Sequence, residues 1–435
     1  MQGETRSANP ALTTRRTFCC TAASLLLTSP SVLGSAAIGQ APPSPPSTPT
    51  RPDVAAVDHD RIIAAATRYL TQAPVPLTAL LCPFSPGTPH DYYSEAPPDP
   101  NSEAAELPFT AHRDAILQLG LAVPALAAAY FLTSDERYAK HAALHLRAWF
   151  VDPATRMTPS LEYGQVRAQA GSAGSTMQNN SLHAAAGRFE GILETLPLVE
   201  VARAIPFLAA SSEISPADLG AARAWFATYL QWLTAPEDSG PRLAALARDQ
   251  KDHHGTSWLL QASAYSNLAL PQGDVAKSED SALGVLRHHY KTVTLRAQIS
   301  PIGRFPHELV STTPYRDSLF NLDMMAAICL LLSTRFESIW DYQLEDGPGM
   351  RGAIAYHFPF IANRSTWPFR ADAQHFNELP SRRDSLLFAA HAYQRPEYAA
   401  LWKTLSPDPT TPDILRSVPI RQPLLWVRTP RPAAS

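Results

Sequence analysis

Apolar residues recur three and four positions apart through most of the chain from residue 54 onward, and few segments alternate with the period of a strand. This spacing places the apolar side chains on one face of a helix. One helix start is also clear, because Ser215 offers a capping hydroxyl and Pro216 suits the first helical position. The clearest predicted helices span residues 58–73, 112–133, 134–152, 215–235 and 317–334.

The number of helical segments limits the choice of architecture. We count about twelve to fourteen predicted helices joined mainly by short loops, so successive helices should pack antiparallel. The pattern contains neither heptad seams nor repeats of fixed length. We therefore expect an all-α fold, an α/α toroid built as an incomplete barrel of about six to seven helical hairpins.

The first forty residues have the pattern of an export signal. Arg15 and Arg16 precede an apolar stretch at 19–27, and small residues follow around 34–37. This pattern is similar to a twin-arginine signal and predicts a periplasmic or secreted protein. No later segment offers the roughly 18 uninterrupted apolar residues of a membrane helix, so we expect no membrane span. The predicted divisions are an export signal at 1–40, a Pro-rich linker at 41–53, a helical toroid domain at 54–405 and a Pro-rich C-terminal tail at 406–435.

The composition excludes several classes of function. With 435 residues, 45% of them hydrophobic, the chain can bury a sizeable core. Its formal net charge of -3 gives no basic field, so nucleic acid is not an expected partner. The chain has no Gly-rich phosphate loop, nucleophile elbow or dinucleotide fingerprint, and we expect no cofactor. Composition leaves the oligomeric state open.

The histidines do not predict a metal site. His141 and His145 lie one helical turn apart, but alanine replaces the glutamate of the zinc-protease pattern. His253 and His254 are adjacent, and their side chains should diverge by about 100° on a helix, which disfavours a shared ion. We therefore expect no bound metal.

Cys82 and Cys329 are the cysteines that follow the predicted export signal, which contains Cys19 and Cys20. Two distant cysteines make no metal motif. A disulfide between them and two separately buried thiols are both compatible with the sequence.

Three stretches carry a resemblance to a known family. They are "EYGQ" with "GRFEGILETLPLVEVARAI", then "DHHGTSWLLQ", then "PIGRFPHELVSTTPYRDSLFNLDMMAAICLL". In this order they resemble the alginate lyase family of polysaccharide lyases, over most of residues 110–405. The resemblance implies a helical toroid that cleaves a uronic-acid polysaccharide, alginate or glucuronan, by β-elimination to unsaturated oligosaccharides. An anionic polysaccharide is thus the expected partner.

The chemistry of β-elimination sets the groups that such a site needs. The reaction removes the hydrogen on C5 of a uronate, beside the C6 carboxylate, and expels O4 of the neighbouring sugar. Because the C5 proton is very weakly acidic, donors must bind the carboxylate and stabilise the enolate-like intermediate. A base must reach C5, and an acid must reach O4.

The second motif supplies two of these groups. Family members carry Asn-Asn-His-Gly-Thr at the start of a helix that lines the cleft, and this chain has Asp252-His253-His254-Gly255-Thr256. The resemblance implies that His254 is the catalytic histidine. It also implies that His253 replaces an asparagine that helps to neutralise the substrate carboxylate. A histidine donates more strongly when protonated, which predicts an altered pH dependence.

The third motif departs from the family pattern. Where the family has an arginine this chain has Ser311, and where the family has a catalytic tyrosine it has Asp317. Three interpretations remain open: Tyr315 and Arg316 compensate, Asp317 belongs to a different catalytic arrangement, or activity is lost. Without a catalytic role, Tyr315 would be a packing aromatic at a helix entry and Asp317 an N-cap.

Further residues are candidates for substrate binding. The stretch 162–181 is rich in Gly, Ser, Gln and Asn, and a loop of this length is usually either functional or disordered. Trp367 would suit a sugar platform, and core packing suits a tryptophan equally. Cations such as Arg304 would bind carboxylates along a chain or form surface pairs. The candidates are Tyr163, Gln165, Asn179, Asn180, His183, Arg188, Trp258, Arg304 and Trp367.

Two other functions fit a similar toroid. A glycoside hydrolase would need two carboxylates about 5 to 10 Å apart across the cleft, and Glu162, Asp252 and Asp317 are candidates. A non-catalytic carbohydrate-binding relative would need no such pair. A hydrolase yields saturated ends, a lyase yields a conjugated double bond that absorbs ultraviolet light, and a binder yields no product. The sequence leaves open which polymer is used and whether cleavage is internal or terminal.

Overall fold

The computed structural model describes five stretches of the chain, residues 52–97, 107–167, 186–236, 242–269 and 281–432. The chain divides into two compact units, Met1–Thr48 and Pro49–Ser435, and every described residue belongs to the second unit. The predicted export signal and nearly all of the predicted linker therefore lie outside the described residues.

The described residues fold mainly into helices. The first α-helices are α1 (Val54–Tyr69), α2 (Ala111–Thr133), α3 (Glu136–Leu146), α4 (Leu198–Leu208), α5 (Pro216–Leu233), α6 (Arg242–Arg248), α7 (His253–Ala269) and α8 (Ala282–His289). They are followed by α9 (Leu295–Gln298), α10 (Pro314–Leu332), α11 (Met350–Ala362), α12 (Asp384–Tyr393), α13 (Pro396–Thr404), α14 (Pro412–Arg416) and α15 (Leu424–Val427). Shorter 3₁₀ or π segments are η1 (Leu77–Ala79), η2 (Arg147–Val151), η4 (Phe189–Thr195), η6 (Tyr290–Thr294), η7 (Arg364–Thr366) and η8 (Phe376–Glu378).

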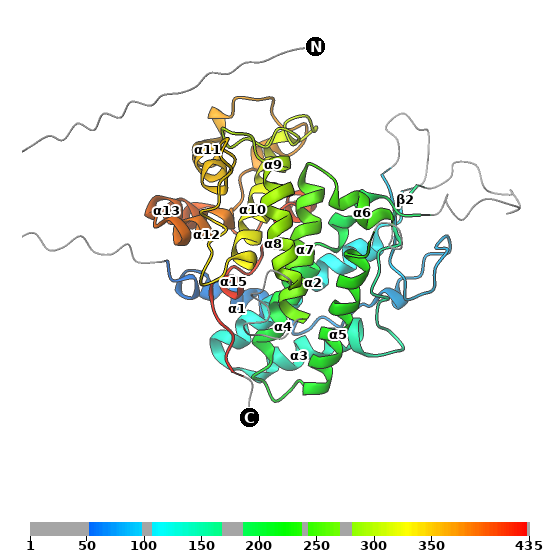
Figure 1. The fold of residues 1–435 in the computed structure, drawn as a ribbon. Coiled ribbons are helices and arrows are strands. Elements are labelled where there is room, and N and C mark those ends of the chain that lie inside the picture. Colours follow the sequence, from blue (N-terminus) through cyan, green and yellow to red (C-terminus); the bar gives the residue numbers. More distant parts are fainter. Residues whose placement is uncertain (1–51, 98–106, 168–185, 237–241, 270–280, 433–435) are drawn as a thin grey trace, which may run out of the picture. The chain divides into compact units, whose positions relative to one another are not determined.

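Contacts between the helices define two layers. Helices α2, α4, α7, α10 and α12 contact one another in succession and form the inner layer. In the outer layer, α1 and α3 pack on α2, α5 and α8 pack on α7, and α11 and α13 pack on α12. Inner and outer helices thus pair as the hairpins of an α/α toroid (Figure 1). The predicted all-α fold class is confirmed.

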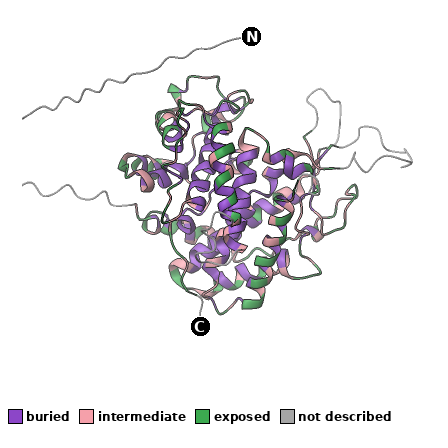
Figure 2. Ribbon diagram, viewed as in Figure 1, coloured by how far each residue is buried: buried purple, intermediate pink, exposed green. Residues whose placement is uncertain are grey.

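The inner helices carry the core, as the burial colours in Figure 2 show. Along α10 every residue from 317 to 329 is buried. A helix that is buried all round has no polar face that would reveal its orientation in the sequence. Its first turn is fixed by the Asp372 carboxylate, which accepts the backbone N–H of Tyr315 at 2.7 Å and that of Arg316 at 3.0 Å.

Helix α2 is the longest of the inner helices and is strongly apolar. By its length of 23 residues and its apolar composition alone, it could cross a membrane. This differs from the expectation that no segment after the export signal would be long and apolar enough. In the structure, 72% of its apolar window is buried inside the domain. This burial is typical of a core helix.

The predicted start of α5 is confirmed. Ser215 precedes the helix, and its Oγ accepts the backbone N–H of Asp218 at 3.0 Å. Pro216 occupies the first helical position, where its missing N–H leaves no bond unmade.

A pair of short parallel strands accompanies the helices. Strand β1 (Tyr93–Glu95) pairs with β2 (Tyr163–Val166), and Tyr93 lies opposite Tyr163. Part of the predicted loop at 162–181 is therefore a strand, and its remainder from 168 lies outside the described residues. The thiols of Cys82 and Cys329 are both free, so of the two alternatives the structure has separate thiols.

The chain after residue 405 is packed into the domain rather than forming a separate tail. Helices α14 and α15 lie in this stretch, and Ile414, Leu424 and Trp426 are at most 7% exposed. Glu200 on α4 anchors it, because its carboxylate accepts the backbone N–H of Arg421 at 3.0 Å and the indole N–H of Trp426 at 2.5 Å. The high proline content led to the prediction of a Pro-rich tail at 406–435, but prolines also start α14 and precede α15.

Candidate active site

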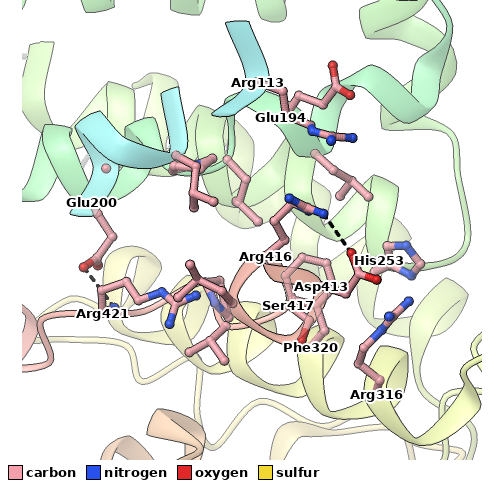
Figure 3. A pocket seen from close by; sticks show the side chains of 18 of the residues that line it. Arg113, Glu194, Glu200, His253, Arg316, Phe320, Asp413, Arg416, Ser417 and Arg421 are labelled. Atoms are coloured by element: carbon pink, nitrogen blue, oxygen red, sulfur yellow. Dashed lines mark hydrogen bonds and ion pairs between the residues drawn. The ribbon is translucent and has the colours of Figure 1, made fainter. Parts of the chain in front are cut away.

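The N-terminal turns of α7 and α10 line a cavity of about 330 Å³, together with parts of α2, η4, α4 and the chain from Asp413 to Arg421. In Figure 3, Arg113, Arg416, His253 and Arg316 lie toward one side of the view, with Glu200 and Arg421 on the other. The lining has four arginines and a histidine beside four carboxylates, so an anionic ligand would bind to the guanidinium and imidazole donors that these carboxylates leave free. The charged residues of the lining are Arg113, Glu194, Glu200, His253, Arg316, Asp317, Asp413, Arg416 and Arg421.

Glu308 fixes His253 at the wall of this cavity. Its Oε1 accepts the backbone N–H of His253 at 2.7 Å, and its Oε2 lies 2.7 Å from the ring Nδ1. Asn321 on α10 donates to Oε1 at 2.8 Å. Glu308 is only 1% exposed, and a buried carboxylate needs such donors. Because Nδ1 is committed to Glu308, the ring presents Nε2, which has no partner among the described residues.

The surroundings of His253 favour its protonated form. Burial alone would lower the pKa of His253, but the carboxylates of Glu308, Asp317 and Asp252 together raise it to about 9. Burial also raises the pKa of Glu308, against the opposing effect of the His253 charge. We place the shared proton on His253 because three carboxylates face the ring. At neutral pH the cavity therefore contains an imidazolium.

His254 forms a similar pair with Asp252. The Nδ1 of His254 lies 2.9 Å from Asp252 Oδ1, and its backbone N–H donates to the same atom at 3.0 Å. Burial alone would raise the pKa of Asp252, but the hydrogen bond from His254 and the charges of His254 and His253 lower it to about 2. An ionised carboxylate at Nδ1 orients the ring and leaves Nε2 as the free nitrogen. The side chain of His254 is 13% exposed and lies beside the His253 ring, but His254 is not among the residues that line the cavity.

The two imidazoles lie side by side instead of diverging. Their ring centroids are 4.3 Å apart and their planes meet at 31°. Phe189 of η4 contacts His254 edge-on, and Phe320 of α10 packs against His253. The predicted divergence of adjacent helical side chains is wrong at this position, because each ring turns toward its own carboxylate at the first turn of α7.

Two sets of donor atoms are close enough to hold a cation. One consists of Asp252, His253 and His254 and the other of His253, Glu308 and Asp317, and within each set the atoms lie within 4.8 Å of one another. The two nitrogen–oxygen pairs in these sets are 2.7 and 2.9 Å apart. Such distances suit a shared proton in each pair.

Arg316 and Asp317 enter the cavity together from the first turn of α10. Arg316 Nε donates to Asp317 Oδ1 at 3.3 Å, and its Nη2 donates to Thr313 at 2.8 Å. The other oxygen of Asp317 accepts the hydroxyls of Ser311 at 2.7 Å and Thr313 at 2.9 Å. Asp317 is thus an acceptor that orients Arg316. It is not the N-cap of α10, which is Thr313.

Tyr315 does not reach the cavity. Its ring is fully buried and packs against Trp367 and Phe376, and its hydroxyl donates to the backbone oxygen of Phe360 at 2.9 Å. Burial raises the pKa of Tyr315 above its ordinary value. The interpretation that Tyr315 compensates for the missing tyrosine is therefore wrong, because its side chain points into the core.

Gln165 is a predicted binding residue that the structure places in the cavity. Its side-chain amide donates to Glu194 at 3.2 Å, and its backbone N–H donates to Ser94 at 2.8 Å. Tyr92 also donates to Glu194, at 2.8 Å. Gln165 has a left-handed backbone with φ of 54°, which is uncommon for a residue other than glycine. These bonds hold Gln165 in a strained conformation at the cavity wall.

Two tryptophans among the predicted binding residues, Trp258 and the predicted sugar platform Trp367, are core residues instead. Trp258 is 5% exposed, and its indole N–H donates to the backbone oxygen of Leu233 at 2.9 Å. Trp367 is 8% exposed and donates to the backbone oxygen of Arg370 at 3.1 Å. Both rings are enclosed by the fold, so neither presents a face to the cavity.

The remaining predicted binding residues lie away from the cavity or outside the described part. Tyr163 is on β2 beside Gln165 but does not line the cavity. Arg188 is ion-paired with Glu190, and Arg304 lies over the ring of Phe369. The predicted residues outside the described stretches are Asn179, Asn180 and His183.

Sequence reasoning missed the residues that orient His253. Glu308 stands in the third motif, directly before Leu309 and Val310, and Asn321 interrupts an apolar run. A lone polar residue within an apolar stretch is a signal of a buried polar partner. This signal was available at both positions, but their partner in the second motif could be found only from the packing of α7 against α10.

Comparisons with known proteins identify the family of this chain. The model of the alginate lyase family matches residues 83–367, which is more than half of the chain. The chain belongs to the alginate lyase family. It is accordingly a polysaccharide lyase, and its substrate is an anionic polysaccharide.

A solved structure of an alginate lyase shares the fold. The structure of an alginate lyase from Bacteroides ovatus is 24% identical over 85% of this chain and 93% of that chain, with a TM-score of 0.67. Alginate lyase A1-III from Sphingomonas species A1 is 13% identical over 78% of this chain and 87% of that chain, with a TM-score of 0.42. No curated protein sequence matches this chain.

The charge state of His253 can be tested directly. We expect the His253 ring to titrate with a pKa near 9 in the wild type. In the Glu308→Gln variant we expect the pKa of His253 to fall toward the ordinary histidine value of about 6.5. A raised folded-state pKa means that the protonated ring stabilises the fold fully below about pH 6.5, and that this contribution is lost as pH rises through about 9. Nuclear magnetic resonance of 15N-labelled histidines measures both values. A wild-type ring that titrates near 6.5 would contradict the assignment.

Proposed function

We propose that this lyase cleaves a polymer of uronic acids, such as alginate or glucuronan, by β-elimination at the described cavity. The observation that carries the proposal is the pair of adjacent histidines held in different electrostatic settings. His253 is surrounded by three carboxylates and is cationic, whereas His254 is oriented by Asp252 alone. Two titratable groups whose surroundings differ in this way take different roles in acid–base chemistry.

The C6 carboxylate of the substrate binds to His253 and Arg316. The Nε2–H of the imidazolium and the free Nη1 of Arg316 are both donors at the same cavity wall. Charge-assisted bonds of this kind withdraw charge from the carboxylate and stabilise the enolate-like intermediate. Asp317 keeps the guanidinium in place. The imidazolium does the work of the asparagine that the family pattern would place there.

His254 removes the C5 proton. Its Nδ1 is held by Asp252, so Nε2 is the nitrogen that accepts the proton. The resulting imidazolium is stabilised by the ionised Asp252 carboxylate. Because Tyr315 is buried and Asp317 is committed as an acceptor, His254 also returns the proton to the departing O4.

A single base and acid limits the stereochemistry of the substrate. The same imidazole can serve both steps only if the C5 hydrogen and O4 lie on the same face of the ring. Mannuronate and glucuronate have this arrangement, whereas guluronate has the two groups on opposite faces. We therefore infer a preference for polymannuronate or glucuronan over polyguluronate.

The hydrolase alternative lacks a pair of available carboxylates. Glu162 accepts the indole N–H of Trp232 at 2.7 Å and does not line the cavity. Asp252 is bonded to His254, and Asp317 is bonded to Arg316 and two hydroxyls. None of the three is placed to activate water opposite another.

Replacing His254 by alanine should abolish cleavage while leaving helical content unchanged, because the backbone N–H that bonds Asp252 is retained. The assay incubates purified protein with polymannuronate, polyguluronate and glucuronan and follows the ultraviolet absorbance of unsaturated products. We expect at least a 100-fold loss in kcat for this variant. His59→Ala, which changes an exposed histidine, is the matched control. Wild-type turnover by the His254 variant would remove this residue from the mechanism.

The paired variants Tyr315→Phe and Asp317→Asn separate packing from function. The phenylalanine variant should lose about 1 kcal/mol of unfolding free energy through its missing bond to Phe360 and should keep kcat within about twofold. The asparagine variant removes one acceptor for Arg316, so we expect a KM at least tenfold higher. Denaturant unfolding and steady-state kinetics give the two readouts. A large fall in kcat for Tyr315→Phe alone would restore the tyrosine as the proton donor.

We also propose that the enzyme is exported to the periplasm or beyond, since Arg15 and Arg16 precede the short apolar stretch at 19–27. A polymeric anionic substrate would be met outside the cytoplasm. The mature chain would then begin within residues 35–42, ahead of the proline-rich stretch.

Amino-terminal sequencing of the protein recovered from the periplasm or medium tests the export proposal. We expect a start between residues 35 and 42 for the wild type, because small residues precede this point. Replacing Arg15 and Arg16 by lysine should keep the full-length chain in the cytoplasm. An unprocessed wild-type chain found only in the cytoplasm would overturn the proposal.

A further inference from the structure

One wall of the cavity comes from the C-terminal wall segment, which we define as residues Asp413–Arg421. Several of its residues line the cavity, among them Asp413, Arg416 and Ser417. This segment lies beyond residue 367, where the match to the family model ends. The cavity is therefore completed by a part of the chain to which the family match assigns nothing.

The C-terminal wall segment is firmly held. Ile414 and Ile420 are buried, and Glu200 accepts the backbone N–H groups of Arg421 at 3.0 Å and Gln422 at 2.9 Å. A buried carboxylate that binds two successive backbone amides fixes the path of the chain. The wall is thus a built part of the cavity.

Arg416 brings a guanidinium to the cavity with most of its donors unused. Its Nη2 donates to Asp413 at 2.8 Å, and its Nη1 lies 3.7 Å from Asp114 Oδ1. The second distance exceeds that of a hydrogen bond. The side chain of Arg416 is 32% exposed, so these donors can reach a ligand.

Arg113 on α2 approaches the same place from the other side. Its Nε lies 3.6 Å from Asp114 Oδ1, the atom that Arg416 also approaches. This Nε is buried and has no hydrogen-bond partner among the described residues, so a ligand would be met by the terminal nitrogens of the side chain, which is 24% exposed. Figure 3 shows both guanidinium groups on the His253 side of the view. Two guanidinium groups with open donors in one cavity form a site for a carboxylate.

We propose that Arg416 and Arg113 bind the carboxylate of a second uronate, next along the chain to the sugar held by His253 and Arg316. This proposal rests on the proposed polyuronate substrate, because every sugar of such a polymer carries one carboxylate. The C-terminal wall segment then selects for polymers that are charged at successive sugars. It does so without contacting the linkage that breaks.

Binding of a saturated mannuronate tetrasaccharide to the His254→Ala background, measured by calorimetry, tests the proposal without turnover. We expect Arg416→Ala to raise Kd at least tenfold, because a hydrogen bond to a charged group is lost, and Arg416→Lys to give an intermediate value. Arg428→Ala is the matched control, since Arg428 follows the same segment, is 46% exposed and pairs with Asp53. It should leave Kd within about twofold.

Turnover by the single variants gives a second readout. Arg416→Ala should raise KM by a similar factor on the cleaved polymer and keep kcat within about threefold, because the second carboxylate is remote from C5 and O4. Equal Kd and KM for Arg416→Ala and Arg428→Ala would overturn the proposal and leave the arginine as a partner of Asp413 only.

The two proposals fail in different ways. One possible result is that Arg416→Ala weakens tetrasaccharide binding while the wild-type protein forms no unsaturated product. This result would support the carboxylate site and overturn the lyase mechanism. If the wild-type protein forms unsaturated product and Arg416→Ala leaves Kd unchanged, the lyase mechanism is supported and the carboxylate site is overturned. A methyl-esterified tetrasaccharide, which has no negative charge, should bind Arg416→Ala and the background protein equally if the second site recognises carboxylate.

Discussion

The active site is organised around the buried carboxylate of Glu308. It accepts the first backbone N–H of α7, the ring nitrogen of His253 and the side-chain amide of Asn321 on α10. Removing any of these donors would leave a buried charge without compensation, so the starts of α7 and α10 must meet in one arrangement. The protonation of His253 follows from this contact. The next residue, His254, is bonded to Asp252 instead, so the two adjacent imidazoles have different carboxylate partners.

Much of the fold and part of the site can be predicted from the sequence. The apolar period of three and four residues is clearest in outer helices such as α1 and α3, which pack one face on a neighbour. The motifs around His253 and Arg316 are short and local, and each begins a helix, so sequence reasoning could place both at the cleft. Helix starts carry signals in the chain itself, such as Ser215 before α5.

The rest depends on packing between distant segments, which leaves no local signal. Tyr315 and Asp317 are two residues apart near the start of α10, a helix buried all round, and nothing in the pattern tells which of them faces the cavity. Glu308 is 55 residues from the histidine it binds. The stretch from 406 resembles a tail by its prolines, yet it is anchored by Glu200 on α4, more than 200 residues away.

The C-terminal wall segment completes the cavity from a part of the chain that is synthesised after the helices of the other walls. The helices that supply the two histidines, Arg316 and Arg113 are all synthesised before Asp413, and the cavity lacks one side until the segment docks on Glu200. Domains generally fold as units during or after synthesis. A chain interrupted shortly before this segment would lack the residues that form one wall of the cavity. The binding site is thus complete only after the chain has been synthesised through Arg421.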